Sequence, residues 1–278
     1  MKRSKWLVSL VAAVAAVSII SPINGAFAQE KEFEGETVTV GVVGDLGKEI
    51  WDYVADKAQE EEGIVIDVSL LTDYNQPNEA VQNGSLDMNA FQHIAFLNDW
   101  NEANDANLVD IGYTFVTEMG IFATDYQSVE ELPEGASIAI PNDPTNGGRA
   151  LLALELAGLI EVDDAAGILA TIDDVTDNPK NIEFVELDAH QVALSLQDVD
   201  AGVLGTGLAT DAGLEIEEAL FVDTEDLDKL DEAYRNIIVV RSEDAENLVY
   251  AKVVELFQQD DVAEVIDEAS SGGAIPAW

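Results

Sequence analysis

The chain of 278 residues contains no cysteine. This absence excludes disulfide bonds, cysteine-ligated zinc, iron–sulfur clusters and thiol nucleophiles. It also excludes a lipid anchor on an N-terminal cysteine of the mature chain. The sequence contains no recognisable metal or nucleotide motif, so we expect a protein without a cofactor.

Basic residues are also scarce, with 12 Lys and Arg against 56 Asp and Glu and a formal net charge of −44. Nucleic-acid-binding proteins concentrate Lys and Arg on one face, so this balance excludes nucleic acid as a partner. It also argues against docking on an anionic membrane. Hydrophobic residues make up 47% of the chain, which disordered acidic chains lack. We therefore predict a folded protein of one large domain or two ordinary ones.

The excess of acid has two explanations. In molar salt the Debye length falls to about 3 Å, so adaptation to a salty medium would screen the repulsion between carboxylates. The alternative is a calcium buffer, but Asp226–Asp228 is not followed by the glycine that a calcium loop of the D-x-[DN]-x-[DN]-G type requires. We therefore favour a solvated acidic surface over metal binding.

The N-terminus has the three parts of a secretory signal peptide. Lys2, Arg3 and Lys5 form a positive start, Trp6–Ile20 is almost wholly apolar, and Ala26–Ala28 is a small-x-small cleavage signal. The alternative is a permanent membrane anchor, for which the apolar run is short and interrupted by serine. We predict cleavage, and a mature protein that works outside the cytoplasmic membrane, in a periplasm or at the cell surface.

Apolar runs and helical patterns alternate along the rest of the chain, which is typical of an α/β protein. Glycines 44 and 47 mark an expected turn after the first strand. Strands are expected at 37–43, 64–71, 86–90, 137–140, 182–186, 202–204 and 236–241, and helices at 48–62, 78–83, 145–157, 191–197 and 244–258.

One strand–turn–helix segment, 140–152, carries the most chemistry. Gly147 and Gly148 open the helix and would let another group approach its backbone. Arg149 stands in the first turn, where a cation opposes the helix dipole, and a guanidinium binds a carboxylate through a bidentate fork. A P-loop is excluded because no Gly-Lys-[Ser/Thr] is present. From the residues alone, a ligand carboxylate and a structural salt bridge remain equally open as the partner of Arg149.

Aromatic residues gather in a second region. Tyr74, Phe91, His93 and Phe96 are expected in loops after strands, and open α/β sheets bind ligands at the carboxyl ends of their strands. The rings could form an apolar pocket in which His93 fixes a polar group. Taken alone, these residues are better explained as ordinary core and a satisfied loop histidine.

Together the two regions resemble the methionine-binding lipoproteins of ABC importers. The resemblance runs from about Val38 to Trp278. It rests on ordered motifs, which are Asp73-Tyr74-x-Gln76-Pro77-Asn78, Asp87-x-Asn89-x-Phe91-Gln92-His93, Pro141-Asn142-Asp143-Pro144-x-Asn146-x-Gly148-Arg149-Ala150-Leu151, Asn178-Pro179-Lys180-Asn181-Ile182, Asp198-Val199-Asp200 and Asn236-Ile237-Ile238-x-x-Arg241.

The resemblance implies a two-lobe periplasmic-binding-protein fold of type 2, with mixed sheets flanked by helices and a ligand cleft between the lobes. It implies an amino-acid ligand, foremost methionine, and delivery to an ABC permease by a protein that is not an enzyme and that we expect to be a monomer. The expected parts are a signal peptide at 1–28, an acidic linker at 29–36, a first lobe at 37–120 and 223–278, and a second lobe at 121–222.

The same resemblance implies the roles of individual residues. Arg149 would bind the ligand carboxylate, while Asn142 and Asn146 would shape the turn beside it. The side-chain pocket would be lined by Tyr74, Phe91, His93, Phe96 and Phe115.

Three departures put methionine in doubt as the ligand. The family usually carries a stretch such as Asn-Asn-x-Tyr-Ala where this chain has Gly205–Ala209, so Thr206 is a candidate for a replaced polar contact. Thr117, Glu118 and Phe122 occupy positions where the family tends to have Tyr-Pro and a later Tyr. Glu118 could accept from an ammonium, but in so acidic a protein it is better explained as a surface glutamate. Phe96 replaces a tyrosine and lacks its hydroxyl.

Other ligands and functions therefore stay open. The same fold could bind another amino acid, a dipeptide or a small carboxylate. An enzyme is disfavoured because the only two histidines, His93 and His190, form no recognisable Ser-His-Asp arrangement. A sensor domain would need a further module after the cleft.

Overall fold

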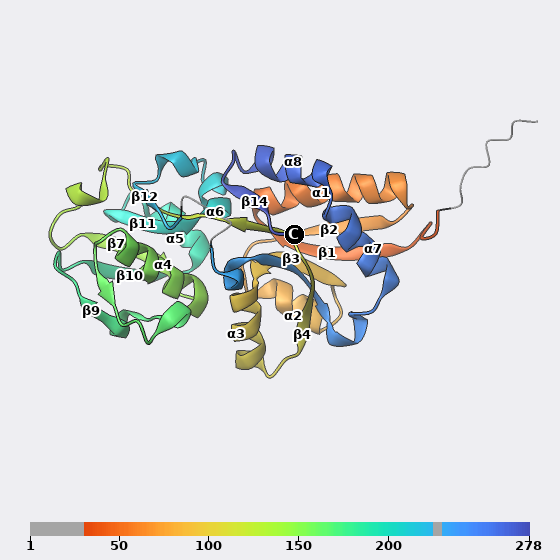
Figure 1. Cartoon of the computed structure of the whole chain (residues 1–278), viewed down its shortest axis with the longest axis horizontal. Helices are drawn as coiled ribbons and strands as arrows, with labels where there is room; N and C mark the ends of the chain where they lie inside the picture. The colour runs from red at the N-terminus through yellow and green to blue at the C-terminus, as the bar shows by residue number, and fades with distance from the viewer. Residues whose placement is uncertain (1–30, 225–229) are drawn as a thin grey trace, which may run out of the picture. The chain divides into compact units, whose positions relative to one another are not determined.

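The computed structural model describes residues 31–224 and 230–278, so the predicted signal peptide and Asp226–Asp228 lie outside the described residues. Two five-stranded mixed sheets organise the described chain (Figure 1). Residues 31–36 of the predicted linker form a turn, in which the Gly35 N–H donates to the Gly63 carbonyl at 3.0 Å. In this described part, no helix is long and apolar enough to cross a membrane.

The first sheet has the strand order β2-β1-β3-β13-β4. Strand β1 runs parallel to β2 and β3, whereas β13 is antiparallel to β3 and β4. The strands are β1 Thr37–Val43, β2 Val65–Leu71, β3 Met88–His93, β4 Leu108–Tyr113 and β13 Asn236–Arg241.

Helices cover both faces of this sheet (Figure 1). They are α1 Gly44–Glu61, α7 Leu248–Phe257 and α8 Asp260–Ala269 on one face, and α2 Gln76–Gln82 and α3 Ile94–Asn104 on the other. Strand β13 shows why: Ile238 packs into the core under α1, and its neighbour Ile237 packs into the opposite core. In α1 the buried residues recur at helical spacing, and Trp51 meets Phe257 with ring centroids 5.1 Å apart.

The second sheet has the strand order β10-β7-β11-β6-β12. Helix α4 packs on one face through residues such as Leu151 and Leu154, while α5 and α6 pack on the other through Val192 and Ala209. The elements are β6 Met119–Phe122, β7 Ser137–Pro141, α4 Pro144–Leu156, β10 Glu183–Leu187, α5 Ala189–Ser195, β11 Ala201–Gly205, α6 Thr206–Asp211 and β12 Phe221–Val222.

Short elements complete the fold. The antiparallel pairs are β5 Phe115–Thr117 with β14 Ala274–Pro276, and β8 Glu161–Val162 with β9 Val175–Asp177. The described 3-10 helices include η1 Val129–Glu131, η2 Gly167–Leu169, η3 Ile172–Asp174, η4 Ile216–Glu218, η6 Glu232–Tyr234 and η7 Ser242–Asp244.

Each sheet with its helices forms one lobe, and the chain passes between the lobes after β4 and again after β12. The expected division of the chain at 120/121 and 222/223 stays a prediction. Strand β6, which begins at Met119, pairs within the second sheet, and β12 ends at Val222.

Several expected elements differ in the structure. Gly44 and Gly47 do not form a separate turn, because α1 already begins at Gly44, whose φ of +79° lets the chain turn directly from strand into helix. The expected helix 244–258 is interrupted: Asn247 caps α7 by accepting from the Val249 N–H at 2.9 Å, so the residues before it lie outside that helix.

Candidate ligand-binding site

A cavity of about 110 Å³ is lined by residues from both lobes. Val43 and His93 contribute from the carboxyl ends of β1 and β3 in the first sheet. Pro141 and Gly205 contribute from the carboxyl ends of β7 and β11 in the second. This is the position in which open α/β sheets bind ligands.

Seven of the ten residues predicted from the sequence line this cavity. They are Tyr74, Phe91, His93, Phe96, Phe115, Asn146 and Arg149. The other three, Asn142, Glu118 and Thr206, are described but do not line it.

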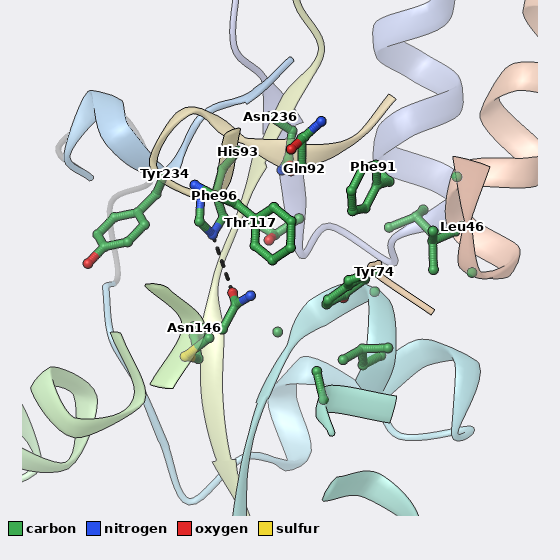
Figure 2. Close-up of a pocket in the computed structure, with 18 of the residues that line it drawn as sticks. Leu46, Tyr74, Phe91, Gln92, His93, Phe96, Thr117, Asn146, Tyr234 and Asn236 are labelled. Atoms are coloured by element: carbon green, nitrogen blue, oxygen red, sulfur yellow. Dashed lines mark hydrogen bonds between the residues drawn. The ribbon is translucent and has the colours of Figure 1, made fainter. Parts of the chain in front are cut away.

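The aromatic residues form one wall of the cavity. Tyr74 lies 5.7 Å from Phe91 and 6.0 Å from Phe96 between ring centroids, and Phe91 meets Phe96 edge-on at 5.7 Å. Figure 2 shows Phe91, Tyr74 and Leu46 together on one side of the cavity. The rings of Tyr74, Phe91 and Phe96 are half-buried and line the cavity. They are therefore not simply part of the protein core. We call this set of three rings, Tyr74, Phe91 and Phe96, the aromatic wall.

The expectation that these residues lie in loops is wrong for most of them. Only Tyr74 lies between elements, after β2. Phe91 and His93 belong to β3, which continues because its pairing with β13 extends to His93 and Asn236. Phe96 lies in the first turn of α3.

His93 joins the two lobes. Its Nδ1 accepts the Phe96 N–H at 3.1 Å and thereby caps α3, while its Nε2 lies 3.3 Å from Oδ1 of Asn146 (dashed in Figure 2). Asn146 Nδ2 donates to Asp143, which leaves Oδ1 as the acceptor for an Nε2–H. Burial and the charge of Arg149 lower the pKa of His93 to about 4, so the ring is neutral at pH 7.

Arg149 is buried and also lines the cavity, with 5% of its side chain exposed. Its Nε donates to Oδ2 of Asp223 at 2.7 Å, and Nη2 donates to the Thr117 carbonyl at 2.8 Å. The guanidinium carbon lies 4.6 Å from the ring centroid of Tyr234. Arg149 therefore forms the structural salt bridge that the sequence left open as one alternative. It also lines the cavity, and its binding of a ligand carboxylate stays a prediction.

Gly147 and Gly148 have a packing role. A Cβ on Gly147 would lie 2.7 Å from the Pro141 carbonyl oxygen, and one on Gly148 would lie 2.4 Å from the Ile168 carbonyl oxygen. Close approach to this helix backbone is therefore made by other segments of the chain. Asp143 caps the helix by accepting from the Asn146 N–H at 2.9 Å.

The three predicted residues outside the cavity have other partners. Asn142 is exposed, and its N–H donates to the Leu187 carbonyl at 2.8 Å. Thr206 is buried, with its hydroxyl 3.1 Å from the Glu118 carbonyl and 3.2 Å from that of Gly273. Thr206 thus connects α6 to the segment that enters β6 and to the turn before β14. Glu118 contributes its backbone carbonyl to this contact, and burial and Asp223 raise the pKa of its side chain.

Sequence reasoning missed other residues that line the cavity. Tyr234 and Asn236 lie where the chain re-enters the first sheet, and Asp211 ends α6. Asp211 Oδ1 accepts the Asp45 N–H at 2.9 Å and so connects the lobes at the start of α1. The position of Asn236, at the start of an apolar strand in a family-like motif, was the available signal for that residue.

Gln92 also lines the cavity and is supported by a buried amide network. Its Oε1 accepts from Asn78 Nδ2 at 2.8 Å, and its Nε2 donates to Asn89 Oδ1 at 2.9 Å. Asn89 Nδ2 in turn donates to Asn78 Oδ1 at 2.9 Å. Fully paired buried amides fix a single arrangement of this strand.

Two helix-flanked mixed sheets, with one cavity lined from both, define a two-lobed solute-binding protein. The chain belongs to the NlpA lipoprotein family, whose model matches residues 38–278. This membership confirms the family expected from the sequence motifs. It also agrees with the expectation of a binding protein and not an enzyme.

Individual relatives agree with this membership. The chain is 35% identical to the D-methionine-binding lipoprotein MetQ of Salmonella typhimurium over 266 residues, 94% of this chain and 96% of that one. A nutrient-binding protein from Burkholderia cenocepacia, solved bound to methionine, is 35% identical with a TM-score of 0.82, covering 87% of this chain and all of that one. The substrate-binding protein of a methionine transporter from Streptococcus pneumoniae is 37% identical with a TM-score of 0.80, covering 87% and 96%.

Proposed function

We propose that this chain is an extracytoplasmic solute-binding protein that captures an amino acid, methionine before others, and delivers it to an ABC permease. One observation carries the proposal: the buried guanidinium of Arg149 and the aromatic wall border the same cavity. A ligand with a carboxylate at one end and an apolar side chain at the other has a partner for each. A thioether gains about 0.3–1.5 kcal/mol from contact with aromatic rings.

Capture requires the two lobes to close on the ligand. Contacts that join the lobes, such as His93 to Asn146 and the Asp45 N–H to Asp211, support a closed arrangement of the described chain. We propose the division expected from the sequence, with a first lobe at 37–120 and 223–278 and a second at 121–222, except that Met119 and Gly120 already pair within the second sheet. Release to the permease would then break these contacts between the lobes.

We further propose that the mature chain acts as a monomer in the periplasm or at the cell surface, after removal of residues 1–28. The relatives are named lipoproteins, whereas this chain has no cysteine to carry a lipid.

The acidic surface of the chain suits a salty medium, because molar salt screens repulsion among exposed carboxylates. Unfolding midpoints that rise from dilute to molar sodium chloride would support this adaptation, and midpoints that fall would contradict it.

A shifted ligand is the second candidate, and a specific observation favours it. Gly205, Gly207 and Leu208 line the cavity, in the stretch where the family resemblance predicts asparagine and an aromatic residue. These smaller side chains remove polar contacts and leave more space. Another amino acid, a dipeptide or a small carboxylate would then bind.

A thermal-shift screen of the mature chain in molar salt tests the proposal. The panel holds L-methionine, D-methionine, the other amino acids, methionyl dipeptides and small carboxylates. A ligand at 100 times its Kd stabilises the fold by about 2.7 kcal/mol. We expect methionine to raise the midpoint of the wild type and of Lys252→Ala, a control whose ion-paired side chain lies outside the cavity lining, but not of Arg149→Ala. A shift with a different compound alone would replace methionine as the ligand, and no shift with any compound would overturn the proposal.

A further inference from the structure

The partner of Arg149 determines the charge at its end of the cavity. Asp223 and Arg149 each have only 5% of the side chain exposed, and Nε to Oδ2 is 2.7 Å. Asp223 is fixed on its other side, where Oδ1 accepts the Met119 N–H at 3.0 Å. This carboxylate does not itself line the cavity, but its two contacts hold the guanidinium that does in one orientation.

Among the described residues, the other ionisable groups near this pair bring no second cation at pH 7, because His93, which interacts with the charge of Arg149, is neutral there. Glu118 interacts electrostatically with both Asp223 and Arg149, and with Glu217 beyond it. Tyr234 stacks on the guanidinium, and burial together with the negative charge of Asp223 raises the pKa of its hydroxyl. Within the described part of the chain, Asp223 therefore already balances the positive charge of Arg149 before a ligand arrives.

A ligand carboxylate on Arg149 would be a second buried anion on one cation. Burying a charge without compensation is strongly unfavourable. An amino acid avoids this penalty because its ammonium lies one carbon from its carboxylate and restores neutrality. A simple carboxylate of the same shape brings no such charge.

We infer that Asp223 is a specificity-determining residue, which makes the cavity select zwitterionic amino acids over simple carboxylates by neutralising Arg149 in advance. The inference rests on the proposed function and deepens it, because it excludes one of the alternative ligand classes. Asp223 is a positioning residue, because it acts by orienting and neutralising the guanidinium of Arg149.

The test compares L-methionine with 4-(methylthio)butanoate, which is methionine without its amino group. Calorimetric titration gives both Kd values for the wild type, Asp223→Asn and Asp223→Glu. The wild type should prefer methionine by at least about 100-fold. This preference corresponds to about 2.8 kcal/mol, at 1.4 kcal/mol for each factor of ten. Asp223→Asn should lower this preference at least tenfold by strengthening binding of the carboxylate, and Asp223→Glu should restore it.

The matched control is Asp231→Asn. This change removes the same charge near Tyr234, but Asp231 is exposed and caps η6 by accepting the Ala233 N–H at 2.9 Å. It should leave the preference unchanged. A merely structural role for Asp223 would weaken both ligands together and would keep their ratio, which would overturn the inference.

A second measurement needs no variant. If the pair stays charged, 4-(methylthio)butanoate can bind the wild type only with uptake of about one proton, so its affinity should rise as pH falls, whereas methionine should bind without uptake. Titrations in buffers of different ionisation enthalpy measure this number. Carboxylate binding without proton uptake, at an affinity close to that of methionine, would overturn the inference.

The outcomes also separate this inference from the proposed function. If methionine fails but another amino acid binds, that amino acid and its desamino counterpart replace the pair of probes. Binding of an amino acid with an unchanged ratio in Asp223→Asn refutes only the role of Asp223. Absence of binding by every amino acid refutes the proposed function and this inference together.

Discussion

At one end of the cavity the guanidinium of Arg149 is held by Asp223, by the Thr117 carbonyl and by the face of Tyr234. The aromatic wall is held by ring contacts instead: its rings meet one another at centroid distances of 5.7 to 6.0 Å, and Tyr74 also meets His190 edge-on at 4.7 Å. Directional polar contacts leave few tolerated partners, whereas apolar contacts depend on area and shape. We therefore expect the polar end to select the head group strictly and the wall to select the side chain loosely.

The largest effect should come from Arg149→Ala. A ligand carboxylate left unpaired would cost about 2–5 kcal/mol of binding, so affinity should fall by more than about 30-fold in calorimetric titration. The free energy of unfolding should also fall by about 3–5 kcal/mol, because Asp223 would be buried without a partner. Unchanged affinity in a folded Arg149→Ala would contradict the polar end described here.

The double variant Arg149→Met, Asp223→Leu sharpens the same prediction. Replacing both members of a buried pair by apolar residues is often neutral for stability. We expect denaturant unfolding close to that of the wild type, with methionine binding still lost. Recovered binding in this variant would show that the head group is held elsewhere.

The next effect concerns pH and the contact that joins the lobes. The folded-state pKa of His93 is about 4, below the usual 6.5, so the unfolded state binds the extra proton first as pH falls. The contribution of the neutral His93 ring to the free energy of unfolding is fully present above pH 6.5. It should decrease by up to about 3 kcal/mol as pH falls to 4. The difference in unfolding free energy between wild type and His93→Gln should change across this window. A constant difference would contradict the buried neutral ring.

The aromatic wall should give a smaller and ligand-dependent effect. Phe91→Ala removes a ring from the wall and should weaken methionine binding by about 1–3 kcal/mol. Alanine as a ligand has almost no side chain to contact the wall, so its affinity should hardly change. Equal losses for methionine and alanine would show that Phe91 supports the fold of the site and does not contact the side chain.

The smallest effect is expected for Phe96→Tyr, which restores the hydroxyl that the family resemblance predicts at this position. A single hydrogen bond contributes about 0.5–1.5 kcal/mol net. We expect methionine affinity to change by less than about tenfold, without loss of stability, as judged by titration and thermal unfolding. A larger change would mean that the wall selects its ligand as strictly as the polar end.

The strand positions and the polar motifs can be predicted from the sequence, because hydrophobic runs and long ordered motifs are local signals. Arg149, His93 and the aromatic wall are predictable in this way. The role of Asp223 is not, since it depends on a pairing across 74 residues in a chain with 56 acidic residues. Any of those carboxylates is an equally good partner until the chain is folded.

Thr206 shows the same limit from the other side. Its position in the stretch that departs from the family pattern predicts a replaced ligand contact, but a hydroxyl at the first residue of α6 is satisfied by the carbonyls of Glu118 and Gly273. Both lie far away in sequence, so no local pattern reveals the contact. Tyr234 was missed for a related reason, because its ring is defined by stacking on Arg149.

The crystal structure of the wild type with methionine bound tests the central claim most directly. We predict the ligand carboxylate within hydrogen-bonding distance of the Arg149 guanidinium, the thioether against the aromatic wall, and Asp223 still paired with Arg149. A ligand in the reverse orientation, or one bound without contact to Arg149, would contradict the account.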